Sequence, residues 1–339
     1  MRNISELVRP SILNLQPYSS ARDEWSGEEG IFLDANENPI GTLNRYPDPF
    51  QKALKSSLQD LKNVNSQSIF IGNGSDEVID LLIRIFCEPV QDQIIICPPT
   101  YGMYEVSASI NNVGVVKIPL DARFQLQTDL ILAQKAKMIF LCSPNNPTGN
   151  QLENLELILA HFDGIVVVDE AYIDFSEEDS CLKKLADFPN LVVIQTMSKA
   201  WGLAAARIGM AFAHPDIIAL LNKVKPPYNV SALNQIAALQ ALERISNFEM
   251  QKQIIIDARN QMVESLKSMS CVRKVHPSEA NFLLVEVSNA NQLYQFLVNK
   301  KIIVRNRHSV VNQCLRITIG TPEENEILMD ALKDFKNEI

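Results

Sequence analysis

Short, continuous apolar runs recur between residues 69 and 212, and no other feature of the sequence limits the possible folds as strongly. Apolar and polar residues do not alternate within them, so both faces of each predicted strand must be covered. Helical patterns separate several runs, as at 76–86 and 153–161. This succession predicts an α/β sheet with helices on both faces. The predicted strands are 94–97, 113–118, 138–142, 165–169, 191–196 and 210–212.

The pattern changes after about residue 240, where a long polar helical stretch, 242–268, begins. Strand-like segments follow at 281–287, 302–307 and 314–320. In the last of these, CLRITIG, the apolar side chains face one way and Arg316 faces the other. We therefore expect a smaller α+β unit, which ends in a helix capped by Thr321 with Pro322 and Glu324 in its first turn.

A chain of 339 residues is long for one hydrophobic core, so two packed units are expected. We expect a large domain over 41–245 and a small domain over 246–339. Residues 1–40 are expected to form an N-terminal arm and part of the small domain. The segment GIFLDANENP, at 30–39, is expected to supply the first strand of the small domain, because it precedes the large-domain pattern and has little else to pair with.

The formal net charge of -9 argues against a general nucleic-acid binder, because phosphate neutralisation needs a basic face. The six cysteines are widely spaced and form neither CxxC pairs nor zinc-type spacings with histidine. They are typical of reduced core thiols in a cytoplasmic protein, and no metal site is expected. The first residues lack the apolar core of a signal peptide, and no apolar run is long enough to cross a membrane.

The stretch TMSKAWGLAAARIG contains a single lysine, Lys199, directly after a buried-looking strand, with Arg207 eight positions later. A lysine at such a place either extends to water or is held with a lowered pKa as a nucleophilic amine. This segment alone leaves both interpretations open.

Three other loops carry polar groups of the kinds that bind ligands. GNGSDE opens a helix whose amides hold a phosphate or are simply capped by Ser75. In CSPNNPTGN, Asn146 points at a ligand or belongs to an ordinary turn. In VVVDEAYIDF, Asp169 needs a cationic partner or strong donors, because a buried unpaired carboxylate is costly. Magnesium ligation and a structural ion pair remain alternatives for Asp169, although no GxxxxGKS or GxxxxGKT motif is present.

Together, these loops supply the groups that one cofactor requires. They are an amine able to form an imine, a phosphate cradle with an arginine, a carboxylate for a protonated ring nitrogen, and Asn with Tyr for a phenolate oxygen. That set describes pyridoxal phosphate. The small residues around Lys199 would let the cofactor ring lie against the chain. The sequence therefore predicts that Lys199 binds this cofactor covalently.

The segments SPNNPTG, VVDEAY and SKAWGLAAARIG resemble the signatures of the class I and II, fold-type I pyridoxal-phosphate-dependent aminotransferases. With NRYPDP, PPTYGMY and CLRITIGT, the chain from about residue 17 to its end is similar to the histidinol-phosphate branch of that family. The resemblance implies a large domain with a mostly parallel seven-stranded sheet between helices, and a smaller α+β domain. It also implies a ping-pong reaction of histidine biosynthesis, in which L-histidinol phosphate and 2-oxoglutarate give imidazole acetol phosphate and L-glutamate.

The resemblance assigns expected roles around the cofactor. Lys199 would form the Schiff base and move the reacting proton, and Asp169 would hold the proton of the ring nitrogen. Asn146 and Tyr172 would bind the 3-oxygen, and Tyr101 would stack on the ring. A homodimer is implied, because one of the residues expected at the cofactor phosphate comes from a second subunit. These phosphate ligands are Gly74, Ser75, Asp76, Ser198, Arg207 and, from that subunit, Tyr46.

Substrate binding is expected from Arg316 and Arg305, helped by Tyr18 of the N-terminal arm and by Asn36. The alternatives within the same fold are an aromatic amino-acid aminotransferase and a phosphothreonine decarboxylase. A regulator that binds the cofactor without turnover is a lesser alternative, because the residues it would be expected to lose are all present.

The sequence departs from the family pattern at a few positions. Ala205 stands where the family often has glycine, and Trp201 where a smaller aromatic residue is common. The loop RNRHSVVNQ contains an extra arginine, Arg307, and a histidine, His308. Which basic side chain of this loop completes the substrate-phosphate site is open.

Overall fold

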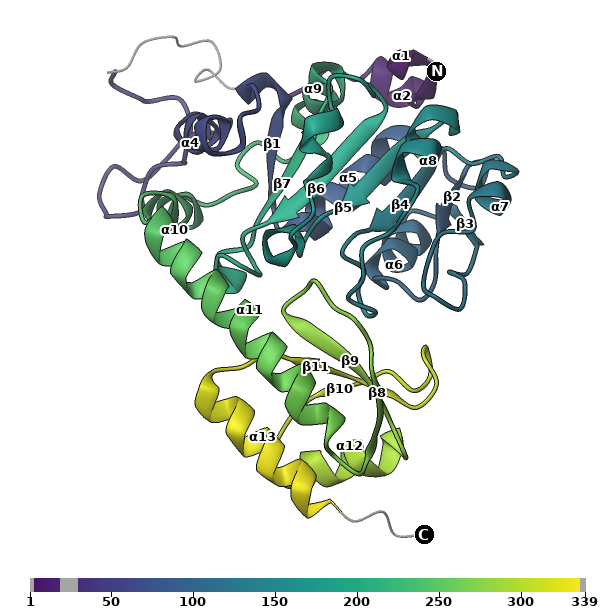
Figure 1. Ribbon diagram of the computed structural model, residues 1–339. Helices are drawn as coiled ribbons and strands as arrows, with labels where there is room; N and C mark the ends of the chain where they lie inside the picture. The colour runs from purple at the N-terminus through teal and green to yellow at the C-terminus, as the bar shows by residue number, and fades with distance from the viewer. Residues whose placement is uncertain (1–2, 19–29, 336–339) are drawn as a thin grey trace.

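The computed structural model describes residues 3–18 and 30–335, and its largest feature is a seven-stranded sheet (Figure 1). The strand order is β1-β7-β6-β5-β4-β2-β3. Neighbouring strands from β3 to β6 are parallel, whereas β7 is antiparallel to both β1 and β6. The mostly parallel sheet expected from the sequence is confirmed. The strands are β1 (Ile69–Asn73), β2 (Gln93–Ile96), β3 (Gly114–Lys117), β4 (Met138–Cys142), β5 (Ile165–Asp169), β6 (Leu191–Thr196) and β7 (Ile208–Ala213).

The central strands of this sheet are buried on both faces, which explains their continuous apolar sequences. In β5, Val166 and Val168 pack into one hydrophobic core, and Ile165 and Val167 into the other. The predicted strands at the positions of β4, β5 and β6 have the observed bounds. β1 is not among the strands predicted from the sequence. It is a short edge strand, and its last residue is exposed.

Helices cover both faces of the large sheet, as expected (Figure 1). On one face, the core includes residues of α1 (Ile4–Leu7), α5 (Ser75–Phe86), α6 (Met103–Ile110) and α9 (Pro215–Val224). On the other, it includes residues of α4 (Lys52–Lys62), α7 (Thr128–Leu132), α8 (Leu155–His161) and α10 (Ala232–Leu242). The short α2 (Pro10–Leu13) follows α1. None of the helices in the described part of the chain combines the length and apolar character needed to cross a bilayer.

The C-terminal part of the chain forms a smaller α+β unit around a four-stranded antiparallel sheet of order β10-β11-β9-β8. Leu315 and Ile317 are buried in its core, while Arg316 lies on the opposite face of β11. Thr321 and Glu324 form the expected capping box. The elements are α11 (Ile245–Lys267), β8 (Val272–Val275), β9 (Phe282–Val287), α12 (Ala290–Asn299), β10 (Arg305–Asn306), β11 (Cys314–Thr318) and α13 (Pro322–Asp334).

The long helix α11 connects the two units (Figure 1). Near its start, Phe248 belongs to the core of the large sheet, and its ring stacks on Trp201 with centroids 3.9 Å apart. Near its end, Met262 and Leu266 belong to the core of the small sheet. The stacking gives the aromatic residue at position 201 a packing partner in α11.

The N-terminal segment does not enter the small sheet, so the expectation of a strand at 30–39 is wrong. Its described residues have no strand conformation, and β8 to β11 complete the small sheet without it. Ile31 and Leu33 are 92% and 87% exposed, so this segment buries little apolar surface within its own chain. The short α1 instead packs Ile4 and Leu7 against the large domain. The division of the chain at residues 40 and 245 stays a prediction.

Candidate active site

A cavity of about 320 Å³ lies where the carboxyl ends of β4, β5 and β6 meet the small domain. Parallel α/β sheets present their ligand sites at this end of the strands. Most of the residues singled out in the sequence line it. From the large domain these are Ser75, Asp76, Tyr101, Asn146, Asp169, Tyr172, Ser198, Lys199 and Arg207, and from the small domain Arg305, Arg307 and Arg316.

Asp169 ends β5 with its side chain buried beneath the cavity. The hydroxyl of Tyr104 donates to Oδ2 at 2.6 Å, and the backbone N–H of Ala171 donates to Oδ1 at 3.1 Å. Burial raises the pKa of Asp169, and both hydrogen bonds oppose that rise. The requirement for strong donors is thus met by neutral groups. Sequence reasoning missed Tyr104, although PPTYGMY places it three residues after the expected Tyr101.

Lys199 lies in the turn that follows β6 and is half-buried. Thr196 shapes this turn, because its Oγ1 accepts the N–H of Ser198 at 3.1 Å and donates to the carbonyl of Ile208 at 3.0 Å. The ammonium of Lys199 lies 5.6 Å from the centroid of the Tyr172 ring. Burial first, and then the charge of Arg316, lower the pKa of Lys199, which increases the fraction of neutral, nucleophilic amine.

The loop between β1 and α5 contacts the start of β7 very closely. Gly74 has φ 79°, and a Cβ placed there would lie 2.5 Å from Nη2 of Arg207. A Cβ on Gly209 would lie 2.2 Å from the backbone of Gly74 and Ser75. Both glycines are therefore required for this contact. Gly74, rather than Ser75 as expected, is the N-cap of α5, because the backbone turns at the glycine and Ser75 is already helical.

Arg207 and the first turn of α5 form one polar group. Nη2 of Arg207 lies 3.4 Å from Oδ2 of Asp76, and the hydroxyl of Tyr101 donates to Oδ1 at 3.1 Å. Ser75 and Ser198 line the cavity beside them. A helix N-terminus with hydroxyls and an arginine is a suitable site for a phosphate.

At the small-domain side of the cavity, Arg316 donates from Nη1 to Oδ1 of Asn146 at 2.5 Å. The amide of Asn146 in turn donates to the hydroxyl of Tyr172 at 3.5 Å. Arg305 is the residue directly opposite Arg316 in the β10–β11 pair, and Arg307 follows two positions later. His308 does not line the cavity, and its Nδ1 accepts the N–H of Gln313 at 3.1 Å.

Four expected site residues do not line this cavity within the single chain: Gly74, which directly precedes Ser75 of the lining, and Tyr46, Asn36 and Tyr18. Tyr46 stacks on Tyr228 at 4.3 Å and lines a separate cavity of about 440 Å³, which Asn36 also lines. Tyr18, at the end of the first described segment, is 72% exposed. Their expected roles stay predictions, and for Tyr46 the prediction already required a second subunit.

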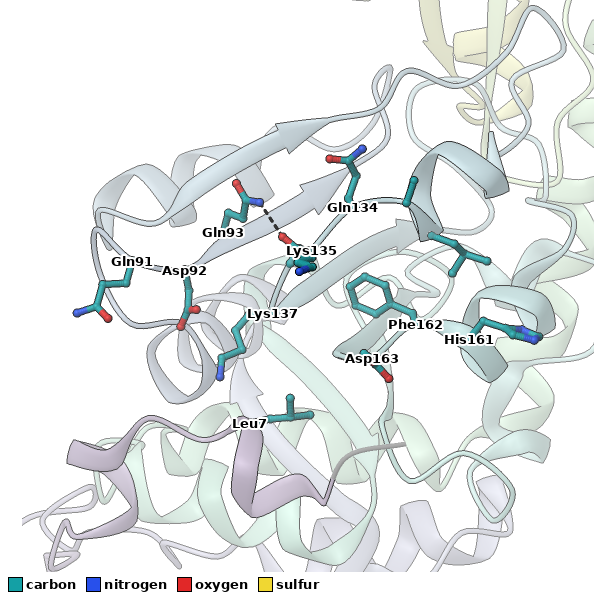
Figure 2. A pocket seen from close by; sticks show the side chains of 13 residues that line it. Leu7, Gln91, Asp92, Gln93, Gln134, Lys135, Lys137, His161, Phe162 and Asp163 are labelled. Atoms are coloured by element: carbon teal, nitrogen blue, oxygen red, sulfur yellow. Dashed lines mark hydrogen bonds between the residues drawn. The ribbon is translucent and has the colours of Figure 1, made fainter.

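A larger cavity, of about 700 Å³, lies at the opposite ends of the strands (Figure 2). Gln93 begins β2 there, and its amide donates to the carbonyl of Lys135 at 2.7 Å. Among the described residues, no buried side-chain nitrogen or oxygen lining this cavity lacks a hydrogen-bond partner. In the smaller cavity, the Nε atoms of Arg307 and Arg316 are buried without a partner in the described chain. The smaller cavity is therefore the candidate active site.

The geometry defines what this site can do. Four arginines and a lysine face two carboxylates, so the cavity favours anionic ligands. Lys199 can attack a carbonyl carbon as an amine, or accept a proton as a base. Burial raises the pKa of Tyr172, so its phenol stays neutral and can donate a hydrogen bond to a ligand oxygen.

Comparison with known proteins agrees with these features. Residues 31–332 match the family model for aminotransferases of class I and II. The histidinol-phosphate aminotransferase of Parabacteroides distasonis is 52% identical over 344 residues, which cover 99% of this chain and 100% of that protein.

Two solved structures have the same fold. The histidinol-phosphate aminotransferase of Clostridium acetobutylicum has a TM-score of 0.79 at 24% identity, over 88% of this chain and 97% of that one. The enzyme of the same name from Sinorhizobium meliloti, solved in complex with pyridoxal-5'-phosphate, has a TM-score of 0.77 at 23% identity, over 86% and 82% of the two chains.

Proposed function

The chain belongs to the class I and II aminotransferases, and from this premise we propose that it transfers the amino group of L-histidinol phosphate to 2-oxoglutarate. The products are imidazole acetol phosphate and L-glutamate, in a step of histidine biosynthesis. The relative from Parabacteroides distasonis, which carries this activity in its name, is similar over the whole chain. The observation that carries the proposal is that Lys199 and Arg316, from different domains, line one cavity.

We propose pyridoxal phosphate as the cofactor, because the residues present fit it. Asp169 offers a buried carboxylate, and the Gly74–Gly209 contact brings the start of α5 against Arg207. When bound, the cofactor supplies a carbonyl that condenses with amines and a conjugated ring that takes up the electron pair of a substrate C–H bond. The family and the cofactor complex of the Sinorhizobium meliloti protein support this assignment.

With this cofactor bound, each residue around it would have a defined role. Asp169 would hold the proton on the ring nitrogen, and Asn146 and Tyr172 would donate to the 3-oxygen. Tyr101 would lie against the ring face. Gly74, Ser75, Asp76, Ser198 and Arg207 would hold the phosphate, with Tyr46 of a second copy of the chain.

Lys199 would both hold the cofactor and move the proton. Nζ of Lys199 would be the group that takes up and moves the proton of the amine-bearing carbon of the substrate. Its lowered pKa favours this, because more of the amine is neutral at a given pH. Arg316 and Arg305 would hold the anionic end of each substrate, the phosphate in one half-reaction and a carboxylate in the other.

We also propose that the active form is a homodimer in the cytoplasm. Ile31, Leu33 and Ile40 are exposed in the N-terminal segment, and a second copy would cover them and bring Tyr46 to the neighbouring site. Tyr18 and Asn36 would approach the substrate from the same segment. The six cysteines are all buried free thiols, as in a reducing compartment, and burial raises the pKa of Cys314 to about 11.

The two half-reactions can be tested separately with purified protein loaded with pyridoxal phosphate. Histidinol phosphate alone should remove the visible absorbance of the lysine-bound cofactor, and 2-oxoglutarate should restore it. If the cofactor binds but its absorbance does not respond to histidinol phosphate, the substrate assignment is wrong. Aromatic amino acids and phosphothreonine are then tested in the same way, and the absence of a response to all of them would favour the non-catalytic alternative.

A further inference from the structure

Three arginines from the small domain gather at one side of the candidate active site. Arg305 and Arg316 are cross-strand partners in the β10–β11 pair, and the backbone N–H of Arg307 continues the ladder to the carbonyl of Cys314 at 2.9 Å. Side chains two residues apart on a strand point to the same face, and all three arginines line the cavity. The expected pair of substrate-binding arginines is therefore a group of three.

An anion between these arginines would be favourable, because like charges opposite each other on neighbouring strands repel. Among the described residues, none of the three arginines forms an ion pair with a carboxylate. Burial, and then the charges of Arg316 and Arg305, lower the pKa of Arg307. The Nε atoms of Arg307 and Arg316 are buried with no partner in the described chain. These groups are thus available to a ligand.

A carboxylate and a phosphate monoester differ in how many arginines they can engage. A carboxylate has one negative charge and two oxygens, which a single bidentate arginine can engage. A phosphate monoester has up to two negative charges and three terminal oxygens, and can engage several guanidinium groups together. Arg316 already donates one hydrogen bond to Asn146, which leaves its remaining donors and those of its neighbours for the ligand.

We propose that Arg307 is a specificity-determining residue, which binds the phosphate of a phosphate-monoester amino donor and contributes little to binding of the carboxylate substrate. This inference rests on the proposed function and adds to it the residue that distinguishes the two substrates of one site. It also gives a role to the arginine by which the chain departs from the family pattern.

The test compares the two half-reactions of the cofactor-loaded enzyme in single turnovers. Arg307→Met should weaken apparent binding of histidinol phosphate about 10- to 100-fold, because it removes a charge-assisted hydrogen-bond donor. Binding of 2-oxoglutarate should weaken by less than about threefold, since a carboxylate does not need the third arginine. Arg307→Lys should lie between these values, because an ammonium keeps the charge without the planar fork.

Arg273→Met is the matched control, because it removes one positive charge from an exposed position on β8 in the same domain. It should change neither half-reaction. Equal losses for both substrates in Arg307→Met would show that Arg307 acts through general positive potential, and no loss would show that it is not a ligand. Either result overturns the inference.

Inorganic phosphate provides a readout that does not require histidinol phosphate to be the substrate. As a competitor of 2-oxoglutarate, it should inhibit Arg307→Met about 10-fold less strongly than the unmodified enzyme. If the unmodified enzyme does not react with histidinol phosphate, the proposed function fails, and phosphate competition still tests Arg307. If the enzyme reacts but phosphate inhibits both forms equally, the inference alone fails.

Discussion

The hydroxyl of Tyr104 lies 2.6 Å from Oδ2 of Asp169 and donates a hydrogen bond to it at the end of β5. Tyr104 is fully buried, and its ring stacks on Phe140 with centroids 4.8 Å apart. The tyrosine is thus fixed by packing while its hydroxyl stabilises the ionised carboxylate. An interaction outside the cavity lining therefore lowers the pKa of a residue within it, against the larger effect of burial, which raises that pKa.

Replacing Tyr104 with Phe should keep the stacked ring and raise the pKa of Asp169, because the hydrogen bond that lowers it is lost. As the pH falls, Asp169 would then lose its charge at a higher pH than in the unmodified enzyme. Affinity for pyridoxal phosphate should fall about 10-fold, in line with the loss of one hydrogen bond to a charged group. Equilibrium dialysis across a pH series measures both effects. Tyr294→Phe, in the small domain, is the control, and identical pH profiles for the two variants would exclude this role.

Replacing Lys199 with Ala should abolish transamination, with a rate loss of at least about 100-fold, because the acid–base group is removed. The rest of the cavity is unchanged, so the variant should still bind pyridoxal phosphate noncovalently. Borohydride reduction followed by mass spectrometry should detect cofactor attached to the unmodified chain and none on the variant. Substantial turnover by Lys199→Ala would contradict the proposed mechanism.

Replacing Arg316 with Met should weaken histidinol phosphate and 2-oxoglutarate together, each by about 10-fold or more, because one guanidinium serves both anions. Single-turnover titrations with each substrate provide the measurement. The loss of only one substrate would indicate separate anion sites. The contrast with Arg307→Met makes the two variants controls for each other.

The same Arg316→Met variant should change the pH dependence of Lys199. The charge of Arg316 lowers the pKa of Lys199, so its removal should raise that pKa and leave less neutral amine at a given pH. The variant without cofactor should therefore need a higher pH than the unmodified protein to condense with pyridoxal phosphate at the same rate. Stopped-flow absorbance measures this rate, and an unshifted profile would show that Arg316 does not act on Lys199 electrostatically.

Replacing Gly209 with Ala should separate β7 from the loop that begins α5, because the new Cβ would lie 2.2 Å from backbone atoms. A destabilisation of about 1–3 kcal/mol is typical of such overpacking, together with weaker cofactor binding. Gly102→Ala is the control, because no atom lies within 4 Å of the Cβ it would add. Thermal unfolding should distinguish the two, and equal melting temperatures would disprove the close-contact argument.

If Tyr46 of one copy of the chain completes the active site of the other, two inactive variants should restore activity when they are combined. Tyr46→Ala lacks the residue expected to reach the neighbouring subunit, and Lys199→Ala lacks the catalytic amine. A mixed dimer would contain one site with both residues intact. Co-refolding the two variants should therefore recover up to about a quarter of the unmodified activity. If mixing restores nothing although mixed dimers form, Tyr46 does not act across the interface.

Much of the large domain could be predicted because its central strands are buried on both faces. The continuous apolar runs of β4, β5 and β6 locate these strands and also the loops that follow them. Asp169 is the last residue of β5, and the loops after β4 and β6 carry Asn146 and Lys199, so most of the site could be predicted with the strands.

Other features depend on tertiary contacts that leave weaker patterns. β8 reads VRKV, and Arg273 and Lys274 in its middle are exposed, so it has no continuous apolar run. Nothing in the sequence around Tyr104 distinguishes it from an ordinary core tyrosine. Only the folded chain shows that its hydroxyl faces Asp169. The segment at 30–39 contains the apolar residues Ile31, Phe32 and Leu33, yet it joins no strand of the described chain, and sequence patterns alone do not distinguish such a segment from a strand in a sheet.

The stacked rings of Trp201 and Phe248 hold the start of α11 against the large domain, while the rest of the helix extends to the small domain. A helix of 23 residues is about 34 Å long, and this one is anchored at one end two residues from the lysine turn. A tilt of a few degrees at Phe248 would displace the far end by a few ångström. The indole ring therefore joins the turn that carries Lys199 to the helix that leads into the small domain.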